Sequence, residues 1–388
     1  MGALLALILL LGACRREAEV PTVHEKEQTI LMLMPWSGNL TSALWQNVRD
    51  MSTAVAEGYA DQSHVMVCFF TDQEDAVLFR LYRRGELCCA DTLVHYRQVD
   101  QTKAEVLAEM LQDVRVHAPA RRYGLVIGSH GTAWIPSADT EPFRGVASKV
   151  KGMPQTRWFG AFNEQSRVDI STLAHAMDIA GWQTEFLLFD DCYMSSVEVA
   201  YELSGYTHYL IGCPTEILSY GMPYHLCAPH LLGVPDYEQL CQAFLQFYTS
   251  KSIPCGTIAV TDCSQLEALA DAVAEIERIS SSDIDPDSIQ CLDGFTQGVF
   301  YDLSDYVCHL TSDSLLLDDF HRIMSSAVPN KAATPNFYSA YNGFNTLRVC
   351  SGLNTSAPSR SPHAATWSET LWALRTKPVR ESRDVSGE

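Results

Sequence analysis

Apolar and polar positions follow two distinct patterns along the chain. Short apolar runs, at residues 29–35, 64–70 and 208–214, are bounded by polar or turn-forming residues. Such runs are typical of strands buried on both faces of a sheet. Apolar residues at helical spacing, at residues 39–57 and 103–116, predict amphipathic helices between the strands. The first half of the chain therefore predicts a succession of strands and helices.

The same succession continues through the second half of the chain. The pattern predicts helices at 195–203 and 237–248, a strand at 256–262 and a long helix ending at Ile279. In the first half of the chain it also predicts a hairpin at 77–89 that turns near Gly85. Strands alternating with helices of about ten to fifteen residues predict β-α-β units. We therefore expect an α/β fold with a mainly parallel sheet. Residues 131–168 show no period, and so long a connection inside a compact domain is usually functional.

Two of the apolar runs stop at a reactive side chain. YGLVIGSHG ends at Gly131 and contains His130, and FLLFDDCYMSS contains Cys192. Functional groups of a parallel sheet lie just beyond the carboxyl ends of its strands, so these runs are expected to bring an imidazole beside a thiol. That pair makes a cysteine nucleophile, because the thiolate attacks while the imidazole handles the proton.

The surroundings of this pair carry further expectations. A helix predicted from Tyr193 onward would put Cys192 near a helix amino terminus, where the dipole stabilises an anion by ~0.3–1 kcal/mol. The backbone amides of Gly131 and Cys192 are candidates for an oxyanion hole. Taken singly, a His at a strand end indicates a surface residue and a lone strand Cys a core residue. Their joint occurrence favours catalysis.

Charge narrows the choice of partner. The 388 residues include 47 acidic and 27 basic side chains, and the formal net charge is -20. An acidic surface argues against nucleic acid or anionic lipid as a partner. We expect no nucleic-acid partner and a monomeric chain.

The cysteines and histidines lack the spacing of a metal or redox motif. There are thirteen cysteines, with no C-x-x-C pair, and no H-E-x-x-H occurs. Cys68 and Cys213 lie inside apolar runs, where a free thiol behaves as a small hydrophobe, so mostly buried thiols are expected. Residues 280–288 (SSSDIDPDS) leave two alternatives, a calcium site and a solvated loop. The solvated loop is favoured, and no metal or other cofactor is expected.

The amino terminus is typical of an export signal. Residues 3–13 form an apolar run that is too short to span a bilayer, which needs ~20 residues, but suits the h-region of a signal peptide. The run ends in Leu-Gly-Ala-Cys14, which resembles the bacterial lipobox whose cysteine is lipidated. We expect residues 1–14 to be a lipoprotein signal, residues 15–27 a polar tether, and the protein a membrane-anchored lipoprotein of the periplasm or cell surface. The alternative is an unlipidated signal peptide.

The order His-Gly at one strand end and Asp-x-Cys at the next resembles the caspase-like cysteine peptidases of clan CD. Within this clan the chain is similar to the clostripain (C11-type) family. The similarity is carried by FDDCYMSSVEVAYEL at 189–203, GCPTEILSYGMPY at 212–224, GTIAVTDCSQLEALADAV at 256–273 and YDLSDYV at 301–307. The resemblance implies a caspase-like three-layer sandwich over residues 28–375, with a mostly parallel central sheet flanked by helices, and a polar tail at 376–388. It also implies cysteine endopeptidase activity on protein or peptide substrates.

The resemblance extends to individual residues. His130 and Cys192 match the family's catalytic dyad, and Asp190 matches the acidic residue that lines the pocket for the P1 side chain, the residue before the scissile bond. Family members tend to cut after Arg or Lys, which a carboxylate would bind through charge-assisted hydrogen bonds. Asp191 is the rival carboxylate, because adjacent strand residues face opposite ways. In the loop after the next strand only Glu216 is acidic, so a preference for acidic or small P1 residues stays open.

Family members are commonly zymogens that cleave themselves between the His and Cys segments. The candidate sites here are Arg144, Lys149, Lys151 and Arg157. The rival interpretation is a catalytically idle caspase-like lipoprotein that binds peptides or a surface partner. The intact His-Gly and Asp-x-Cys pairings argue against it, because a degenerate relative would be expected to have lost one of them.

Overall fold

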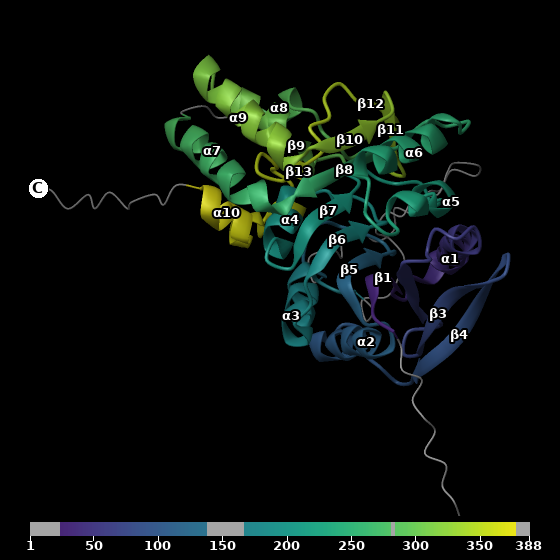
Figure 1. Ribbon diagram of the computed structural model, residues 1–388. Helices are drawn as coiled ribbons and strands as arrows, with labels where there is room; N and C mark the ends of the chain where they lie inside the picture. Colours follow the sequence, from purple (N-terminus) through teal and green to yellow (C-terminus); the bar gives the residue numbers. More distant parts are fainter. Residues whose placement is uncertain (1–23, 138–166, 281–283, 378–388) are drawn as a thin grey trace, which may run out of the picture.

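The computed structural model describes residues 24–137, 167–280 and 284–377. Within these ranges nine strands form the main sheet: β1 (Lys26–Met34), β2 (Ser63–Phe70), β3 (Ala76–Arg84), β4 (Leu87–Tyr96), β5 (Ala120–Ile127), β6 (Thr184–Phe189), β7 (Thr207–Gly212), β8 (Thr257–Asp262) and β10 (Asn330–Ala333). Their order across the sheet is β10-β8-β7-β6-β5-β1-β2-β3-β4 (Figure 1).

The centre of this sheet is parallel and its two edges are antiparallel. Strands β7, β6, β5, β1 and β2 pair in parallel. Strands β8 and β10 add to one side, and β3 and β4 to the other, all by antiparallel pairing. All eight residues of β2 are buried, which is why the central strands show as continuous apolar runs. The expected hairpin is present, with Gly85 at its turn at φ +66°.

Helices cover both faces of the sheet (Figure 1). One face carries α1 (Thr41–Ala56), α5 (Tyr224–Cys227) and α6 (Tyr237–Thr249). The other carries α2 (Ala104–His117), α3 (Ile170–Ala180), α4 (Val197–Leu203), α7 (Leu266–Ile279), α8 (Leu303–Leu310), α9 (Ser314–Ala327) and α10 (Leu371–Thr376). The result is the three-layer α/β sandwich that the sequence predicts.

Right-handed crossovers explain this division of the helices. The chain moves from β1 to β2 in one direction across the sheet, and from β5 through β6 to β7 in the other. A helix that connects strands in one direction across the sheet packs on the opposite face from a helix that connects strands in the other direction. Helix α1 therefore lies on the opposite face of the sheet from α2 and α3. The direction of travel reverses between β1 and β5, and α/β proteins bind ligands at the carboxyl ends of strands at such a switch point.

The helix boundaries follow the apolar spacing. In α1 the buried residues Leu44, Val48, Met51 and Val55 recur at three- and four-residue intervals and so lie on one face. The helices predicted at 39–57, 103–116 and 237–248 correspond to α1, α2 and α6 to within two residues at each end. The helix predicted to end at Ile279 is α7.

In the described part of the chain, two small sheets accompany the main sheet. They are formed by β11 (Asn336–Ser339) with β12 (Gly343–Thr346), and by β9 (Tyr301–Asp302) with β13 (Asn354–Thr355). Asn354 also forms a bridge with Ser196, close to Cys192 in the sequence. The end of the chain is thereby joined to the segment that carries the cysteine.

The described cysteines are free thiols, as the sequence analysis expects. Seven of them are buried: Cys68, Cys192, Cys213, Cys227, Cys241, Cys255 and Cys263. Among the described residues, no helix combines the length and the apolar character needed to cross a membrane.

Candidate active site

Strands β5 and β6 bring the His segment and the Cys segment to one edge of the sheet. Their parallel pairing sets Ile127 opposite Phe189, and the Asp190 amide donates a hydrogen bond to the Ile127 carbonyl at 2.8 Å. His130 lies three residues beyond the end of β5, and Cys192 lies three residues beyond the end of β6. The two reactive side chains therefore leave the sheet at matching positions on neighbouring strands.

Gly131 accounts for the close approach of the two segments. A β-carbon at this position would collide with the Cys192 carbonyl oxygen and crowd Asp191 and Met194. Only glycine admits backbone at this distance. The contact keeps the two candidate oxyanion-hole amides, those of Gly131 and Cys192, in one neighbourhood.

The thiol of Cys192 is covered and protonated in this conformation. The residue is 0% exposed. Its Sγ accepts a hydrogen bond from the Ile217 amide at 3.3 Å and lies 3.7 Å from the Ile217 carbonyl oxygen. Burial raises the pKa of this thiol well above its usual value, and the nearby Glu216 carboxylate raises it further. In this conformation the sulfur is therefore closed to a peptide substrate.

The expected helix amino terminus at Cys192 is absent, which corrects the sequence analysis. Helix α4 begins at Val197, with Ser196 as an extended N-cap. Tyr193 has a left-handed backbone, at φ +63°, which no helix accommodates. The dipole of α4 therefore acts too far away to stabilise a thiolate, because its effect is confined to the first turn.

His130 is held by a residue that the sequence analysis missed. A hydrogen bond of 2.8 Å joins its Nε2 to the side-chain oxygen of Asn39. Asn39 lies in the turn after β1, the strand next to β5, so both residues stand at the same sheet edge. The sequence could have indicated Asn39 only as a polar residue that follows a buried strand.

Asp190 and Asp191 face opposite sides of the sheet. Asp190 is fully buried, and its carboxylate accepts hydrogen bonds from the Met222 amide at 2.7 Å and the Tyr224 hydroxyl at 3.2 Å. Tyr224 is the first residue of α5, so Asp190 is on the face of α1, α5 and α6. It holds the loop that follows β7.

Asp191 is instead tied to the His segment. Its carboxylate accepts hydrogen bonds from the backbone amide of Ser129 and, at 3.4 Å, from the Ser129 hydroxyl. Ser129 immediately precedes His130, and Asp191 immediately precedes Cys192. This pair of bonds links the His segment to the Cys segment on the face of α2 and α3.

Glu216 is buried at the base of the Cys segment. It is 3% exposed, and its carboxylate accepts hydrogen bonds from the Tyr193 hydroxyl at 2.9 Å, the Ala340 amide at 2.9 Å and the Ser339 hydroxyl. Tyr193 stacks on Phe300, with ring centroids 4.5 Å apart. These contacts hold the strained residue next to Cys192 in place.

Asn354 supports the same segment from the far end of the chain. Its Nδ2 donates to the carbonyl oxygens of Tyr193 and Pro214, both at 3.0 Å, and its backbone amide donates to the Ser195 carbonyl at 2.9 Å. Nothing in the sequence marked this residue, since it lies some 160 positions from the residues it holds.

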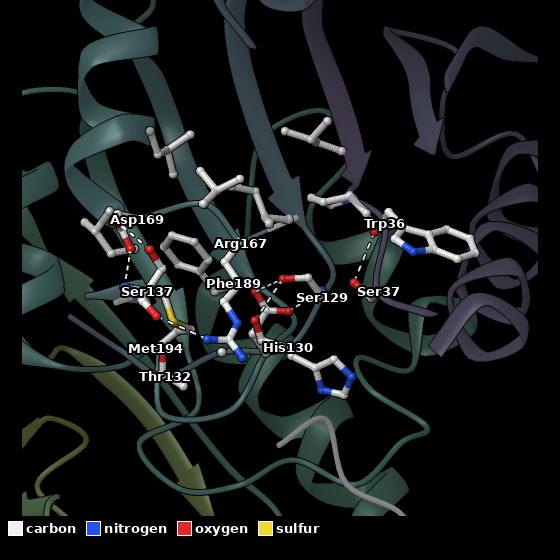
Figure 2. Close-up of a pocket in the computed structure, with 18 of the residues that line it drawn as sticks. Trp36, Ser37, Ser129, His130, Thr132, Ser137, Arg167, Asp169, Phe189 and Met194 are labelled. Atoms are coloured by element: carbon white, nitrogen blue, oxygen red, sulfur yellow. Dashed lines mark hydrogen bonds between the residues drawn. The ribbon is translucent and has the colours of Figure 1, made fainter. Parts of the chain in front are cut away.

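A cavity of about 180 Å³ opens beside His130 at the β1–β5 switch point. Figure 2 shows its polar rim, where Arg167 reaches towards Ser137 and donates to the Ser137 carbonyl at 3.1 Å. Ser137 is in turn fixed by Asp169, which accepts from its amide at 2.7 Å. Asp191 and Gly131 also line this cavity.

Comparison with known proteins identifies the family. The profile of the clostripain family matches residues 39–334. A secreted C11 cysteine protease from Bacteroides thetaiotaomicron, called iotapain, is 39% identical with a TM-score of 0.84, over 91% of this chain and 100% of that chain. The chain belongs to the clostripain family of cysteine peptidases.

Other solved clostripain-family structures agree in fold. A clostripain from Bacteroides thetaiotaomicron in complex with a peptide inhibitor is 43% identical with a TM-score of 0.55, over 57% of this chain and 100% of that chain. An inactive zymogen C11 protease from Parabacteroides distasonis is 24% identical with a TM-score of 0.78, over 92% and 99%. No protein among those with curated functions matches the chain.

Several residues predicted for this clostripain-family peptidase lie outside the described ranges. They are the lipidation candidate Cys14 and the self-cleavage candidates Arg144, Lys149, Lys151 and Arg157. The 280–288 segment is described only in part, and there Asp285 caps a short turn by accepting from the Asp287 amide at 3.2 Å. Within the described ranges, no group of three or more His, Cys, Asp or Glu side chains is arranged to hold a metal ion.

Proposed function

We propose that this peptidase uses Cys192 as its nucleophile and His130 as its acid and base, and that it cleaves proteins or peptides after Arg or Lys. The observation that carries the dyad is the register of β5 with β6, which sets both side chains three residues beyond adjacent strand ends. The close contact of Gly131 with the Cys192 backbone supports the same pairing.

The chemistry follows from these groups. The thiolate attacks the scissile carbonyl, and the Gly131 and Cys192 amides stabilise the resulting oxyanion. The carbon–nitrogen bond then breaks while His130 transfers a proton to the leaving amine. Water, deprotonated by His130, finally hydrolyses the thioester and regenerates the thiol. No cofactor enters any of these steps.

We assign the P1 preference to Asp190. Its carboxylate lies at the sheet edge on the face of α5, and its contacts with Met222 and Tyr224 hold its orientation. A guanidinium or ammonium group would pair with it through charge-assisted hydrogen bonds. The clostripain from Bacteroides thetaiotaomicron was solved with the inhibitor BTN-VLTK-AOMK, whose peptide part ends in lysine. The Tyr193, Ser339 and Ala340 contacts of Glu216 favour a supporting role for that carboxylate.

The covered thiol supports a latent form that becomes active after rearrangement. Cys192 is sealed and protonated, and His130 is bonded to Asn39. We propose that cleavage at Arg144, Lys149 or Lys151, between the two catalytic segments, releases the segment around Ile217. The family membership favours this latent enzyme over a catalytically idle protein of the same fold.

The decisive experiment uses fluorogenic peptides with Arg, Lys, Asp or Ala at P1, and the protein without residues 1–14. Turnover of Arg and Lys peptides by the wild type, with none by Cys192→Ala, is the expected result. Turnover of only Asp or Ala peptides would keep the dyad and remove Asp190 as the specificity residue. No turnover of any of the four substrates, including after limited proteolysis, would exclude the proposed peptidase activity.

Self-cleavage is tested by following the 43.1 kDa chain on a denaturing gel. The wild type is expected to split into two fragments, while Cys192→Ala remains one band. Replacing Arg144, Lys149 and Lys151 by Gln should delay the split. A wild type that stays uncut with full activity would contradict self-activation.

We also propose export and lipid anchoring through Cys14. The secreted character of iotapain supports export, and the Leu-Gly-Ala-Cys14 motif supports lipidation. In a bacterial host, Cys14→Ser should move the protein from the membrane fraction to the soluble exported fraction. Equal distribution of both forms would exclude the anchor.

A further inference from the structure

The cavity beside His130 is not used by the proposed mechanism. Cys192 and Asp190 are not among its lining residues, although His130, Gly131 and Asp191 are. It therefore lies on the face of α2 and α3, opposite the carboxylate assigned to P1. The β1–β5 switch point where it opens is the place where α/β folds bind ligands.

The cavity has an apolar interior and a polar rim. Leu107 from α2 and Leu173 and Ile170 from α3 form one wall, and Ile127 and Phe189 from the ends of β5 and β6 form the floor. Figure 2 shows Phe189 and Met194 beside the rim residues Arg167 and Ser137. Arg167 on the rim donates to the Ser137 carbonyl at 3.1 Å. The apolar side chains of the wall and floor favour an apolar occupant.

The place of His130 determines which substrate residue enters. The imidazole must protonate the leaving amine, which belongs to the residue after the scissile bond, P1′. P1′ therefore lies against His130, at the mouth of this cavity. In an extended peptide adjacent side chains point to opposite sides, so a P1 side chain directed at Asp190 sends the P1′ side chain towards α2 and α3.

We propose that this cavity is a specificity pocket for an aliphatic or aromatic side chain at P1′. The inference rests on the proposed dyad and on Asp190 as the P1 residue. A cavity of about 150 Å³ with apolar walls holds benzene, so about 180 Å³ accommodates a Leu, Met or Phe side chain. Each buried CH₂ is worth about fourfold in an equilibrium constant. Leu at P1′ is therefore favoured over Gly by tenfold or more.

The first test measures kcat/KM of the full-length chain on internally quenched peptides with Arg at P1. One series varies P1′ through Gly, Ala, Leu, Phe and Asp, and a second varies P2 with Gly held at P1′. The expected order at P1′ is Leu and Phe above Ala, with Gly and Asp last. A flat P1′ series, or an apolar preference at P2 only, would overturn the pocket assignment.

Nα-benzoyl-arginine methyl ester separates the two proposals, because its methanol leaving group is too small to fill the cavity. Hydrolysis of this ester together with a flat P1′ series removes the pocket and leaves the dyad intact. No hydrolysis of the ester or of any peptide, before or after incubation for self-cleavage, overturns both.

A variant locates the preference in this cavity. Ile170→Ala removes a partly exposed wall residue, and the ratio of kcat/KM for Leu over Gly at P1′ should fall at least fivefold. Ile323→Ala in α9, also partly exposed but remote from the cavity, is the matched control and should keep the wild-type ratio. An unchanged ratio in Ile170→Ala, with Ile323→Ala also unchanged, would show that another surface selects P1′.

Discussion

Adjacent carboxylates in this protein have different tasks because a strand end sends them to opposite faces. Asp190 is bonded to Met222 and Tyr224 on the face of α5. Asp191 bonds the amide and hydroxyl of Ser129, the residue before His130. We interpret Asp191 as a positioning residue, since its bonds to Ser129 set the His segment relative to the Cys segment.

Asp191→Ala should lower kcat by about 10- to 100-fold with little change in KM, because a misplacement of about 1 Å in a catalytic group can cost that much. Asp191→Asn should recover most of the rate, because its amide oxygen still accepts from the Ser129 amide. Steady-state kinetics on an Arg-P1 peptide measures both variants. If Asp191→Asn does not restore kcat, or if KM rises while kcat is unchanged, Asp191 would have a role in substrate binding instead.

Helix α4 follows the Cys segment and is anchored by a buried carboxylate. Glu198 is 2% exposed and accepts hydrogen bonds from the Thr355 hydroxyl at 2.7 Å, the Ser356 amide at 3.0 Å and the Trp367 indole at 2.6 Å. Ser196, the N-cap, donates to the same carboxylate. The helix behind the cysteine is thereby bonded to the last part of the described chain.

Removing this anchor should destabilise the protein strongly. Glu198→Ala leaves several buried donors without an acceptor, and each such group costs ~1–3 kcal/mol, so the free energy of unfolding should fall by about 3 kcal/mol or more. Glu198→Gln keeps one acceptor and should lose less. Urea denaturation measures the change, with the exposed Glu275→Ala in α7 as a control that should shift by under ~0.5 kcal/mol. Equal stability of Glu198→Ala and the control would refute the anchor.

At the scale of the whole molecule, seven of the described thiols are buried, and their burial makes the free energy of unfolding depend on pH in the alkaline range. Burial raises the pKa of Cys68, Cys241 and Cys263 each to about 12. An unfolded chain loses these protons near pH 8.5, whereas the folded chain keeps them to about pH 12. The stabilisation is complete below pH 8.5 and is lost as the pH rises through the folded-state pKa.

Between pH 9 and 11, each buried thiol should therefore lower the free energy of unfolding by up to about 1.4 kcal/mol per pH unit. Urea denaturation at pH 7.5, 9 and 10.5, under reducing conditions, measures the slope. Cys68→Ala should reduce the slope of the free energy of unfolding against pH by the contribution of one titrating thiol. The same variant should lower stability at pH 7.5, because it leaves a cavity. A slope that does not change in this variant would show that the thiol titrates normally in the folded state.

The elements and the family of this protein are encoded in short local segments, so they could be predicted from the sequence. Buried parallel strands read as continuous apolar runs, and α1, α2 and α6 follow their apolar spacing. The His and Cys segments were recognisable because each reactive residue lies three residues beyond the end of such a run. Family and fold class therefore followed from short segments whose meaning does not depend on distant contacts.

Only the tertiary structure decided which residues contact the proposed dyad and in what state Cys192 is held. Asn39 and Asn354 act across strands or from the far end of the chain, and no local pattern announces such contacts. The different tasks of Asp190 and Asp191 depend on which partners each face offers, and the left-handed Tyr193 depends on Glu216 and Phe300. Burial and a neighbouring carboxylate set the protonation of Cys192, and both are properties of packing.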